Sequence, residues 1–429
     1  MAKKIKKILL AIPILIAAAV ALLAIYVFWI QPVTTRTAGT DIDIARRVEA
    51  NQQNVEKLTK LPRYDETAAE PVQLDFRSKD LSDLNLEGKL LELEHGMFSN
   101  ETIWPTVLPQ EYNPDIVFEN GKNPGLSIRA LHEAGITGAG VSIGIIDQTL
   151  YTEHSEYKSK LKHYEEIHAL SKIPEMHGAA VASLAVGETT GVSPSSDLYF
   201  IASALSDNLG TMLWARGQDS KGIDYSRGIT YRYYAEAIQR FLELNETLSE
   251  KEKIRVISIS RGFNKLDDGY KEFHAAVKKA KDKGIFVVTA TLLNDYDVGL
   301  AGLGKTAMGD PDELASYSVG SWMKEDAEDY QNYLFVPMDG RTYAGTNGAV
   351  NYQYDPVGGL SWTIPYLAGV YALACQVNPA ITPELFLETA VETADSLIVD
   401  NNGASFQIKY LLNPTKLIEK LKVQDTISR

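Results

Sequence analysis

Apolar and polar positions divide the chain into an N-terminal region and a longer region of alternating elements. Residues 8–30 form an apolar run of 23 residues without a charge, directly after the lysine-rich start MAKKIKK. As a helix this run would be about 34 Å long, enough to cross a hydrocarbon core of about 30 Å. The pattern therefore predicts one N-terminal transmembrane helix over residues 8–30.

A cleavable signal peptide is the alternative interpretation of this run. Such a peptide usually has a shorter apolar region and ends in small residues, whereas this run ends in the bulky stretch AIYVFWIQP. Tyr26 and Trp29 suit the aromatic belt of the outer interface, and the preceding lysines are expected to stay cytoplasmic. We therefore expect residues 1–7 to be a cytoplasmic basic segment and residues 8–30 a retained signal anchor. The following chain is expected to be extracytoplasmic.

The pattern is irregular between this run and residue 120. Residues 31–60 are mainly polar, with apolar residues loosely at helical spacing, which is typical of a stalk. Residues 61–120 mix short apolar alternations such as LSDLNLEGKLLEL with turn-forming residues. We interpret residues 31–120 as a stalk followed by an N-terminal extension, which could be an accessory layer, a pro-segment or a wrapping segment.

A regular alternation of helices and strands begins near Pro124. Helical patterns cover residues 126–135, 177–187 and 269–284, and continuously apolar strand patterns cover residues 138–147, 255–263 and 285–291. Apolar strands that alternate with helices are typical of a parallel sheet covered on both faces. The pattern predicts a doubly wound, mainly parallel α/β domain over residues 121–425.

Three residues with complementary chemistry fall at the ends of these elements. Asp147 ends the strand 138–147, His177 begins the helix 177–187, and Ser361 precedes an apolar helix in GGLSWTIPYLAG. Such positions meet at the carboxyl edge of a parallel sheet. A serine becomes a nucleophile when an imidazole removes its proton and a carboxylate orients that imidazole. Each residue alone could be a structural cap, but together they predict a catalytic triad.

Asp147, His177 and Ser361, in this order and separated by 30 and 184 residues, resemble the triad of the subtilisin-like serine proteases. The segment MHGAAVASLAVG is similar to the family motif H-G-T-x-V-A, and GGLSWTIPYLAG is similar to G-T-S-M-A-T-P-H-V-A-G. Three more segments, GVSPSSDLYFIA, VISISRGF and LLNPTKLIEKL, are similar to other family segments in the same order. The sequence departs from the family at D-Q-T after the strand, at Ala179, and at Leu360 and Trp362 around the serine.

The resemblance implies a subtilisin-like fold and a serine endopeptidase that forms an acyl-enzyme intermediate. An extended peptide or protein substrate would add a strand beside Ser258, Ser260 and Gly262, which gives affinity without sequence choice. No organic cofactor is implied. The family often binds structural calcium, but no loop in this sequence is acidic enough for us to assign its ligands, and no other metal site is assigned.

The oxyanion hole is where the sequence departs furthest from the family. The Ser361 backbone N–H would supply one donor, and an asparagine usually supplies the other. In the segment TATLLNDYD, Asn294 is the nearest asparagine, whereas a strict alignment places Leu293 or Leu292 at the family position. Asn294 is therefore our candidate for the second donor, and a slow enzyme that lacks this donor is the alternative.

Two further features have competing interpretations. Arg261 in the cleft strand points either to solvent or inward, where it would favour an acidic side chain in the substrate. His163 and His168 lie five residues apart in the charged stretch KHYEEIH, a spacing that favours a solvated helix over a metal site.

Composition narrows the functions that remain. The net charge of −14 disfavours nucleic acid as a partner. Cys375 is the single cysteine and lies in the apolar run VYALACQV, which excludes an intrachain disulfide and a multi-cysteine metal site. Two hypotheses remain for a chain tethered to the membrane. One is an active peptidase, and the other is a catalytically weak or inactive peptide-binding module or scaffold with the same fold.

Overall fold

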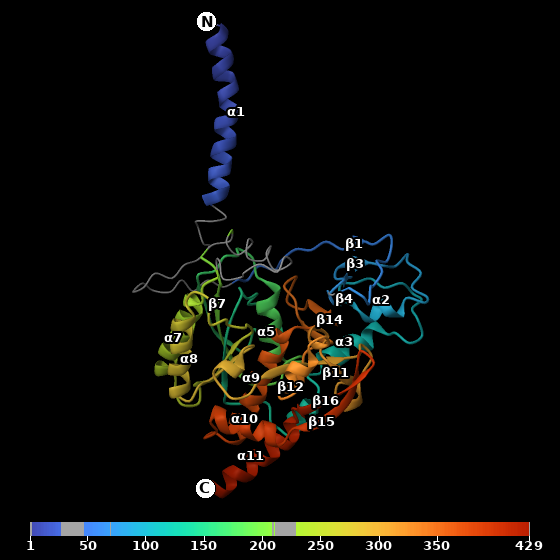
Figure 1. Cartoon of the computed structure of the whole chain (residues 1–429), viewed down its shortest axis with the longest axis vertical. Helices are drawn as coiled ribbons and strands as arrows, with labels where there is room; N and C mark the ends of the chain where they lie inside the picture. The colour runs from blue at the N-terminus through green and yellow to red at the C-terminus, as the bar shows by residue number, and fades with distance from the viewer. Residues whose placement is uncertain (1, 27–46, 69, 208–209, 211–228, 429) are drawn as a thin grey trace.

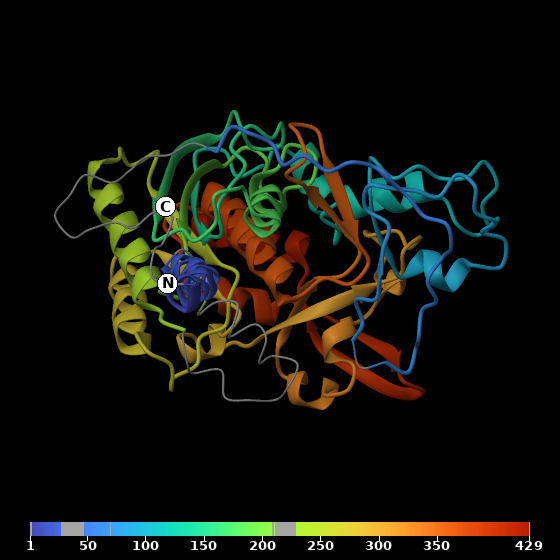
Figure 2. The ribbon, with the colours of Figure 1, turned by 90° about the horizontal axis from the view of Figure 1, so that it is seen from above.

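A computed structural model describes residues 2–26, 47–68, 70–207, 210 and 229–428 (Figure 1). Most of the predicted stalk, residues 31–46, lies outside the described residues. Figure 2 shows helices α7 and α8 at one side of the molecule and the N-terminal extension, in blue and cyan, at the other. The central parallel sheet lies between them.

The central sheet has five strands in the order β6-β7-β5-β8-β9, and all four pairs are parallel. Its strands are β5 (Ser142–Asp147), β6 (Leu161–Ile167), β7 (Asp197–Ser203), β8 (Ile254–Ile259) and β9 (Phe286–Thr289). The strands expected within residues 138–147, 255–263 and 285–291 are therefore confirmed. The parallel order also confirms the doubly wound α/β class.

Helices cover both faces of this sheet. Ile145 packs in the cluster that contains helices α5 (Met176–Val186) and α9 (Leu360–Val377), whereas its neighbour Ile146 packs with α7 (Arg232–Thr247) and α8 (Tyr270–Asp282). Successive side chains of a strand point to opposite faces. Since both faces are covered, every residue of β5 is buried, which explains why its sequence is continuously apolar.

The stretch KHYEEIH is strand β6 and not the solvated helix that its charges suggested. Glu165 and Glu166 are buried, and each is paired with an arginine that is distant in sequence. Arg240 donates to Glu165 at 2.8 Å from helix α7, and Arg47 donates to Glu166 at 2.6 Å. The charges of this strand are neutralised inside the fold, a pairing that sequence spacing could not reveal.

A second five-stranded sheet, in the order β11-β10-β12-β16-β15, completes the main domain. Strands β10, β12 and β16 are parallel, and β11 and β15 pair antiparallel at the two edges. The segment LLNPTKLIEKL, which resembles a family segment, contains the start of the last helix, α11. The bounds are β10 (Leu300–Lys305), β11 (Tyr317–Val319), β12 (Leu334–Pro337), α10 (Pro383–Glu392), β15 (Asp395–Asn401), β16 (Ala404–Leu411) and α11 (Pro414–Ser428).

The N-terminal extension shares a sheet with the main domain. Strand β4 (Gly96–Ser99) pairs antiparallel with β14 (Tyr352–Asp355), so that the four-stranded order is β13-β14-β4-β2. The extension is thus built onto the hairpin that leads into helix α9. The remaining bounds are β1 (Glu56–Lys57), β2 (Leu74–Asp75), β3 (Lys79–Asp80), α2 (Leu90–Glu94), α3 (Pro114–Lys122), α4 (Ile128–Glu133) and β13 (Arg341–Ala344).

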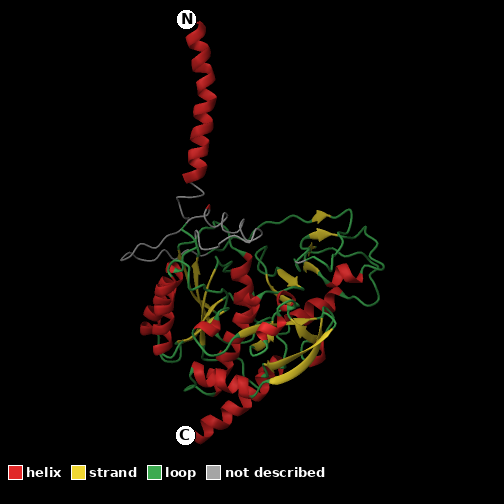
Figure 3. Ribbon diagram, in the orientation of Figure 1, coloured by secondary structure: helices red, strands yellow, loops and turns green. Residues whose placement is uncertain are grey.

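The N-terminal apolar run is helical as far as it is described. Helix α1 (Ala2–Ile25) is continuous (Figure 3), and its side chains from residue 12 onward are exposed. Among the described residues, the helix that is long and apolar enough to cross a membrane is α9, and 78% of its span is buried inside the domain. That burial is typical of a core helix. Residues 27–30 of the predicted anchor lie outside the described residues, and the anchor stays a prediction.

Phe98 tests whether the extension is an integral part of the folded domain. This side chain is 2% exposed and packs against Tyr354 of strand β14 with 5.0 Å between ring centroids. The change Phe98→Ala should lower the free energy of unfolding by about 3–5 kcal/mol because it leaves a cavity between the extension and the hairpin. Urea unfolding of the full chain measures this loss.

Val107→Ala is the matched control in the same extension. Val107 is 70% exposed, so its truncation should change stability by at most about 0.5 kcal/mol. If Phe98→Ala and Val107→Ala had the same small effect on the main unfolding transition, the extension would be a loosely attached segment.

Candidate active site

Asp147 is presented by the carboxyl end of the central strand β5. The strand pairs with β8 as far as Ile145 and with β7 as far as Asp147 itself, and this pairing fixes the position of its last residue. The Asp147 side chain is buried, and its Oδ1 accepts a hydrogen bond from the Gln148 backbone N–H at 2.8 Å. This carboxylate is therefore held at the sheet edge where the sequence predicted it.

His177 faces Asp147 from the first turn of helix α5. Its Nδ1 lies 2.7 Å from Asp147 Oδ1. Since an ionised carboxylate can only accept hydrogen bonds, Nδ1 carries the proton and Nε2 is left for another partner. Gly178 explains the close approach of the helix to the strand, because a Cβ at this position would lie 2.6 Å from the carbonyl oxygen of Gln148.

The surroundings of His177 favour its protonated form. Burial lowers the pKa of this imidazole, but the charge of Asp147 and its hydrogen bond raise it, and the net pKa is above the usual value of 6.5. Arg261 opposes the shift and Glu175 supports it. The ring of Trp362 packs against the imidazole with 5.3 Å between centroids.

Ser361 lies in the first turn of helix α9, where backbone N–H groups have no partner within the helix. Its Oγ donates to the backbone carbonyl of Ser260 at 3.4 Å, and Ser260 Oγ donates to the Ser361 carbonyl at 2.9 Å. No hydrogen bond joins Ser361 Oγ to His177 in the part of the chain that the structure describes. The serine hydroxyl must rotate away from Ser260 before the imidazole can accept its proton.

Asp339 holds the turn that precedes the serine. Its Oδ1 accepts from the Gly358 backbone N–H at 2.8 Å, and its Oδ2 accepts from the backbone N–H and the hydroxyl of Ser321. Burial raises the pKa of Asp339 to about 6. The sequence contains no signal for Asp339, because this residue lies outside the family motifs and its partners are distant in sequence.

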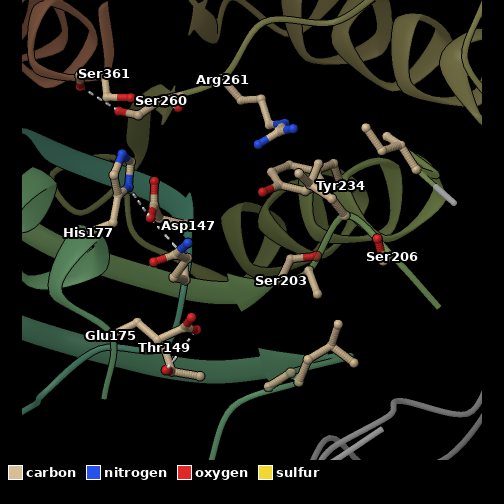
Figure 4. A pocket seen from close by; sticks show the side chains of 16 residues that line it. Asp147, Thr149, Glu175, His177, Ser203, Ser206, Tyr234, Ser260, Arg261 and Ser361 are labelled. Atoms are coloured by element: carbon tan, nitrogen blue, oxygen red, sulfur yellow. Dashed lines mark hydrogen bonds and ion pairs between the residues drawn. The ribbon is translucent and has the colours of Figure 1, made fainter. Parts of the chain in front are cut away.

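One pocket brings the three predicted triad residues together (Figure 4). Ser361 and His177 lie at one end, and Asp147 lies beneath the imidazole. Arg261 points into the pocket, so the inward alternative is the one observed. Tyr234, Ser203 and Glu175 also line it. These three residues were missed because no motif marks them.

The three residues predicted to bind an extended peptide differ in their accessibility. Ser258 is fully buried within β8, between Ile145 of β5 and Val288 of β9, and has no free edge for a peptide. Ser260 follows the strand and lines the pocket, and Gly262 is exposed. Residues 260–262 are therefore the part of this segment that a peptide can reach.

Asn294 does not line the pocket. It lies in a short 3-10 helix, Leu292–Asn294, and its Nδ2 donates to the carbonyl oxygen of Phe263 at 3.3 Å. Leu293 beside it is half-exposed. The amide would have to leave Phe263 to serve as an oxyanion donor, so the role of Asn294 stays a prediction.

The described residues contain no group of three His, Cys, Asp or Glu side chains placed to hold a metal ion. His168, one of the two histidines considered above, stacks on Tyr233 with 3.8 Å between ring centroids, and its Nε2 lies 2.8 Å from the Asp207 carbonyl. His163 pairs with Glu165 at 2.8 Å. Both histidines have structural contacts.

The sheet, the helices on both faces and the Asp–His pair beside a serine define a subtilisin-like serine peptidase. A model of the subtilase family matches residues 138–410, which is more than half of the chain, and the chain belongs to this family. Two solved structures are similar over 68% of this chain and 98% of their own. They are the prenylagaramide maturation protease PagA, at 15% identity and a TM-score of 0.46, and a mutant of the protease domain of PatA, at 18% identity and a TM-score of 0.44.

The pH dependence of activity tests the pairing of Asp147 with His177. The imidazole must be neutral to act as a base, so kcat/KM should rise with pH through the pKa of His177. Because Asp147 stabilises the protonated ring, this rise should lie above the usual value of 6.5. Asp147→Asn should move the rise to lower pH and reduce kcat by about 10⁴-fold, since it also disturbs the tautomer.

Glu250→Gln is the control, because its side chain is 94% exposed and pairs only with Lys253 at 3.8 Å among the described residues. It should leave the pH profile in place. An Asp147→Asn enzyme with the wild-type pH profile would exclude Asp147 as the partner that sets the pKa of the base.

Proposed function

We propose that this chain is a serine endopeptidase in which Ser361, His177 and Asp147 act as the triad and form an acyl-enzyme intermediate. The observation that carries the proposal is the 2.7 Å contact of Asp147 with His177 at the end of a pocket that Ser361 also lines. A second part of the proposal is that the domain is tethered to the outer face of the membrane by the N-terminal helix.

The reaction follows from the roles of the three side chains. His177 Nε2 removes the Ser361 hydroxyl proton while Oγ attacks the scissile carbonyl carbon. The protonated imidazole, stabilised by Asp147, then donates this proton to the amine as the C–N bond breaks. Water adds to the acyl-enzyme by the same route, with His177 first as base and then as acid, and releases the carboxylic acid product.

Stabilisation of the oxyanion would begin with the Ser361 backbone N–H in the first turn of α9. Preorganised donors at this place matter because charge develops on the carbonyl oxygen in the transition state. Loss of one donor typically costs about 10²–10³ in kcat. Because the Asn294 amide donates to the Phe263 carbonyl, it is not free to stabilise the oxyanion. We therefore favour the alternative of a slow enzyme that lacks this second donor.

A catalytically weak or inactive peptide-binding module is the second candidate function. Two observations favour it: the Ser361 hydroxyl is donated to the Ser260 carbonyl and not to the imidazole, and Asn294 does not line the pocket. A fluorophosphonate probe separates the two candidates, because covalent labelling of Ser361 requires an activated serine and no particular peptide.

Substitution of the triad tests the chemistry. Ser361→Ala should leave folding intact, since among the described residues the hydroxyl makes a single hydrogen bond, at 3.4 Å. Peptide hydrolysis should nevertheless fall by about 10⁴-fold or more, and His177→Ala should cost a similar factor. Because the two residues act as a unit, the double variant should be little slower than either single one.

Ser249→Ala serves as the control, since Ser249 is exposed and its hydroxyl donates to Glu252 on the surface. Single-turnover and steady-state hydrolysis of a fluorogenic peptide measures each variant. Losses that multiply in the double variant, or wild-type hydrolysis by Ser361→Ala, would contradict the assignment of the triad.

The orientation of the chain tests the tether. The lysines before the apolar run favour a cytoplasmic N-terminus, so protease added to intact cells should remove the peptidase domain and spare the N-terminal segment. A cytoplasmic protein followed in the same cells controls for lysis. A domain that is protected until the cells are lysed would reverse the orientation, and a domain recovered in the medium would show that it is released.

A further inference from the structure

Arg261 is a cationic side chain fixed beside the catalytic residues. It follows Ser260, the residue that exchanges two hydrogen bonds with Ser361. Its backbone N–H donates to the Ile259 carbonyl at 2.6 Å, and its carbonyl accepts from the Ala290 N–H at 2.9 Å. Because the backbone is held on both sides, the fold fixes the direction in which the side chain leaves the backbone, and the side chain lines the pocket (Figure 4).

The guanidinium of Arg261 has no partner among the described residues. Its Nε is buried and makes no hydrogen bond there. Two other partly buried arginines do have partners. Arg240 donates two hydrogen bonds to Glu165, and Arg47 donates two hydrogen bonds to Glu166. A buried donor without a partner is costly. An unpaired arginine that faces a pocket is therefore a place where a ligand can supply the missing acceptor.

The polar groups of the pocket divide it into a cationic and an anionic end. In Figure 4 the guanidinium extends toward Tyr234, whereas Glu175 lies at the opposite end beside Thr149. The Ser203 hydroxyl is buried without a partner among the described residues, so it is a second free donor in the pocket.

Both carboxylates of the pocket already have partners. Asp147 accepts from His177 and from the Gln148 N–H. Glu175 accepts from the Thr149 hydroxyl at 3.3 Å. None of these three contacts involves Arg261, so the cationic end stays available to a bound molecule.

We propose that Arg261 is a specificity-determining residue that binds a carboxylate of the peptide substrate, supplied by a glutamate or aspartate side chain close to the scissile bond. A planar guanidinium binds a carboxylate through two parallel hydrogen bonds, which selects it over a neutral amide. The inference rests on the proposed peptidase function and names the class of substrate for the same site.

The geometry places this carboxylate on the chain that is cut. Residues 260–262 are the segment that an extended peptide can pair with, and in such a peptide alternate side chains point to the same side. A peptide whose carbonyl lies at Ser361 therefore directs a neighbouring side chain toward Arg261, which is one residue from Ser260.

Matched peptide series test the proposal. Amidated, internally quenched peptides carry Glu, Gln or Lys in turn at each of the positions flanking one cleavage site, and kcat/KM is measured for the full-length enzyme. We expect Glu to exceed Gln by about tenfold at one position, as for a charge-assisted hydrogen bond made in place of a neutral one. A neutral peptide with a free C-terminus, compared with its amide, distinguishes the terminal carboxylate from a side chain.

Variants of Arg261 assign the preference to this residue. In Arg261→Gln the ratio of Glu to Gln peptides should fall to near one, and in Arg261→Glu the preference should change to Lys. Arg261→Lys should retain a reduced preference for Glu, because it keeps the charge but loses the two-pronged contact.

The results separate this proposal from the function on which it rests. If the wild-type enzyme cleaves the Glu and Gln series equally at every position and ignores a free C-terminus, the specificity role is overturned while the peptidase function stands. A ratio that survives Arg261→Gln would also overturn it. If Arg261→Gln moved only the pH profile, the residue would act on the pKa of His177 and not on the substrate. Absence of both cleavage and fluorophosphonate labelling would overturn both proposals. The peptide series with the wild-type enzyme tests the specificity even if an Arg261 variant fails to fold.

Discussion

The hydrogen bond between Asp147 and His177 is the contact on which the rest of the site depends. It joins the end of a buried strand to the start of a buried helix, and it requires the two backbones to approach closely at Gly178. A buried carboxylate is costly unless it is hydrogen-bonded. Here the Asp147 carboxylate accepts hydrogen bonds from the imidazole and from the Gln148 N–H. The pair therefore provides hydrogen bonds to the buried carboxylate and also sets the position of the His177 imidazole.

The position of Ser361 depends on a different set of contacts. Helix α9 is enclosed in the core, and the turn before it is fastened by Asp339 through Gly358. The hairpin that leads into this turn is paired with strand β4 of the N-terminal extension. The extension therefore supports the segment that carries Ser361. We expect the extension to be a structural part of the domain, so that its removal would disturb the position of Ser361.

The pocket combines one contact that is already made with two polar groups that a bound molecule could still engage. Asp147 and His177 are already joined, whereas the Ser361 hydroxyl is bonded to Ser260 and Arg261 has no acceptor among the described residues. A peptide paired with residues 260–262 would lie against both the Ser361 hydroxyl and the Arg261 guanidinium. Substrate binding and rotation of the serine hydroxyl are thus expected to be coupled at Ser260.

The sequence alone determined the fold class and the candidate triad, because both depend on local patterns. Continuously apolar strands report a sheet covered on both faces, and Asp147, His177 and Ser361 stand at element ends whatever the details of packing. The tertiary structure decided what depends on contacts between distant segments. It made KHYEEIH a strand by pairing its glutamates with Arg47 and Arg240, and it buried Ser258 between two strands. It also turned Arg261 into the pocket and Asn294 toward Phe263. These outcomes follow from partners at least 30 residues away or from the direction of a side chain, which hydrophobic periodicity does not encode.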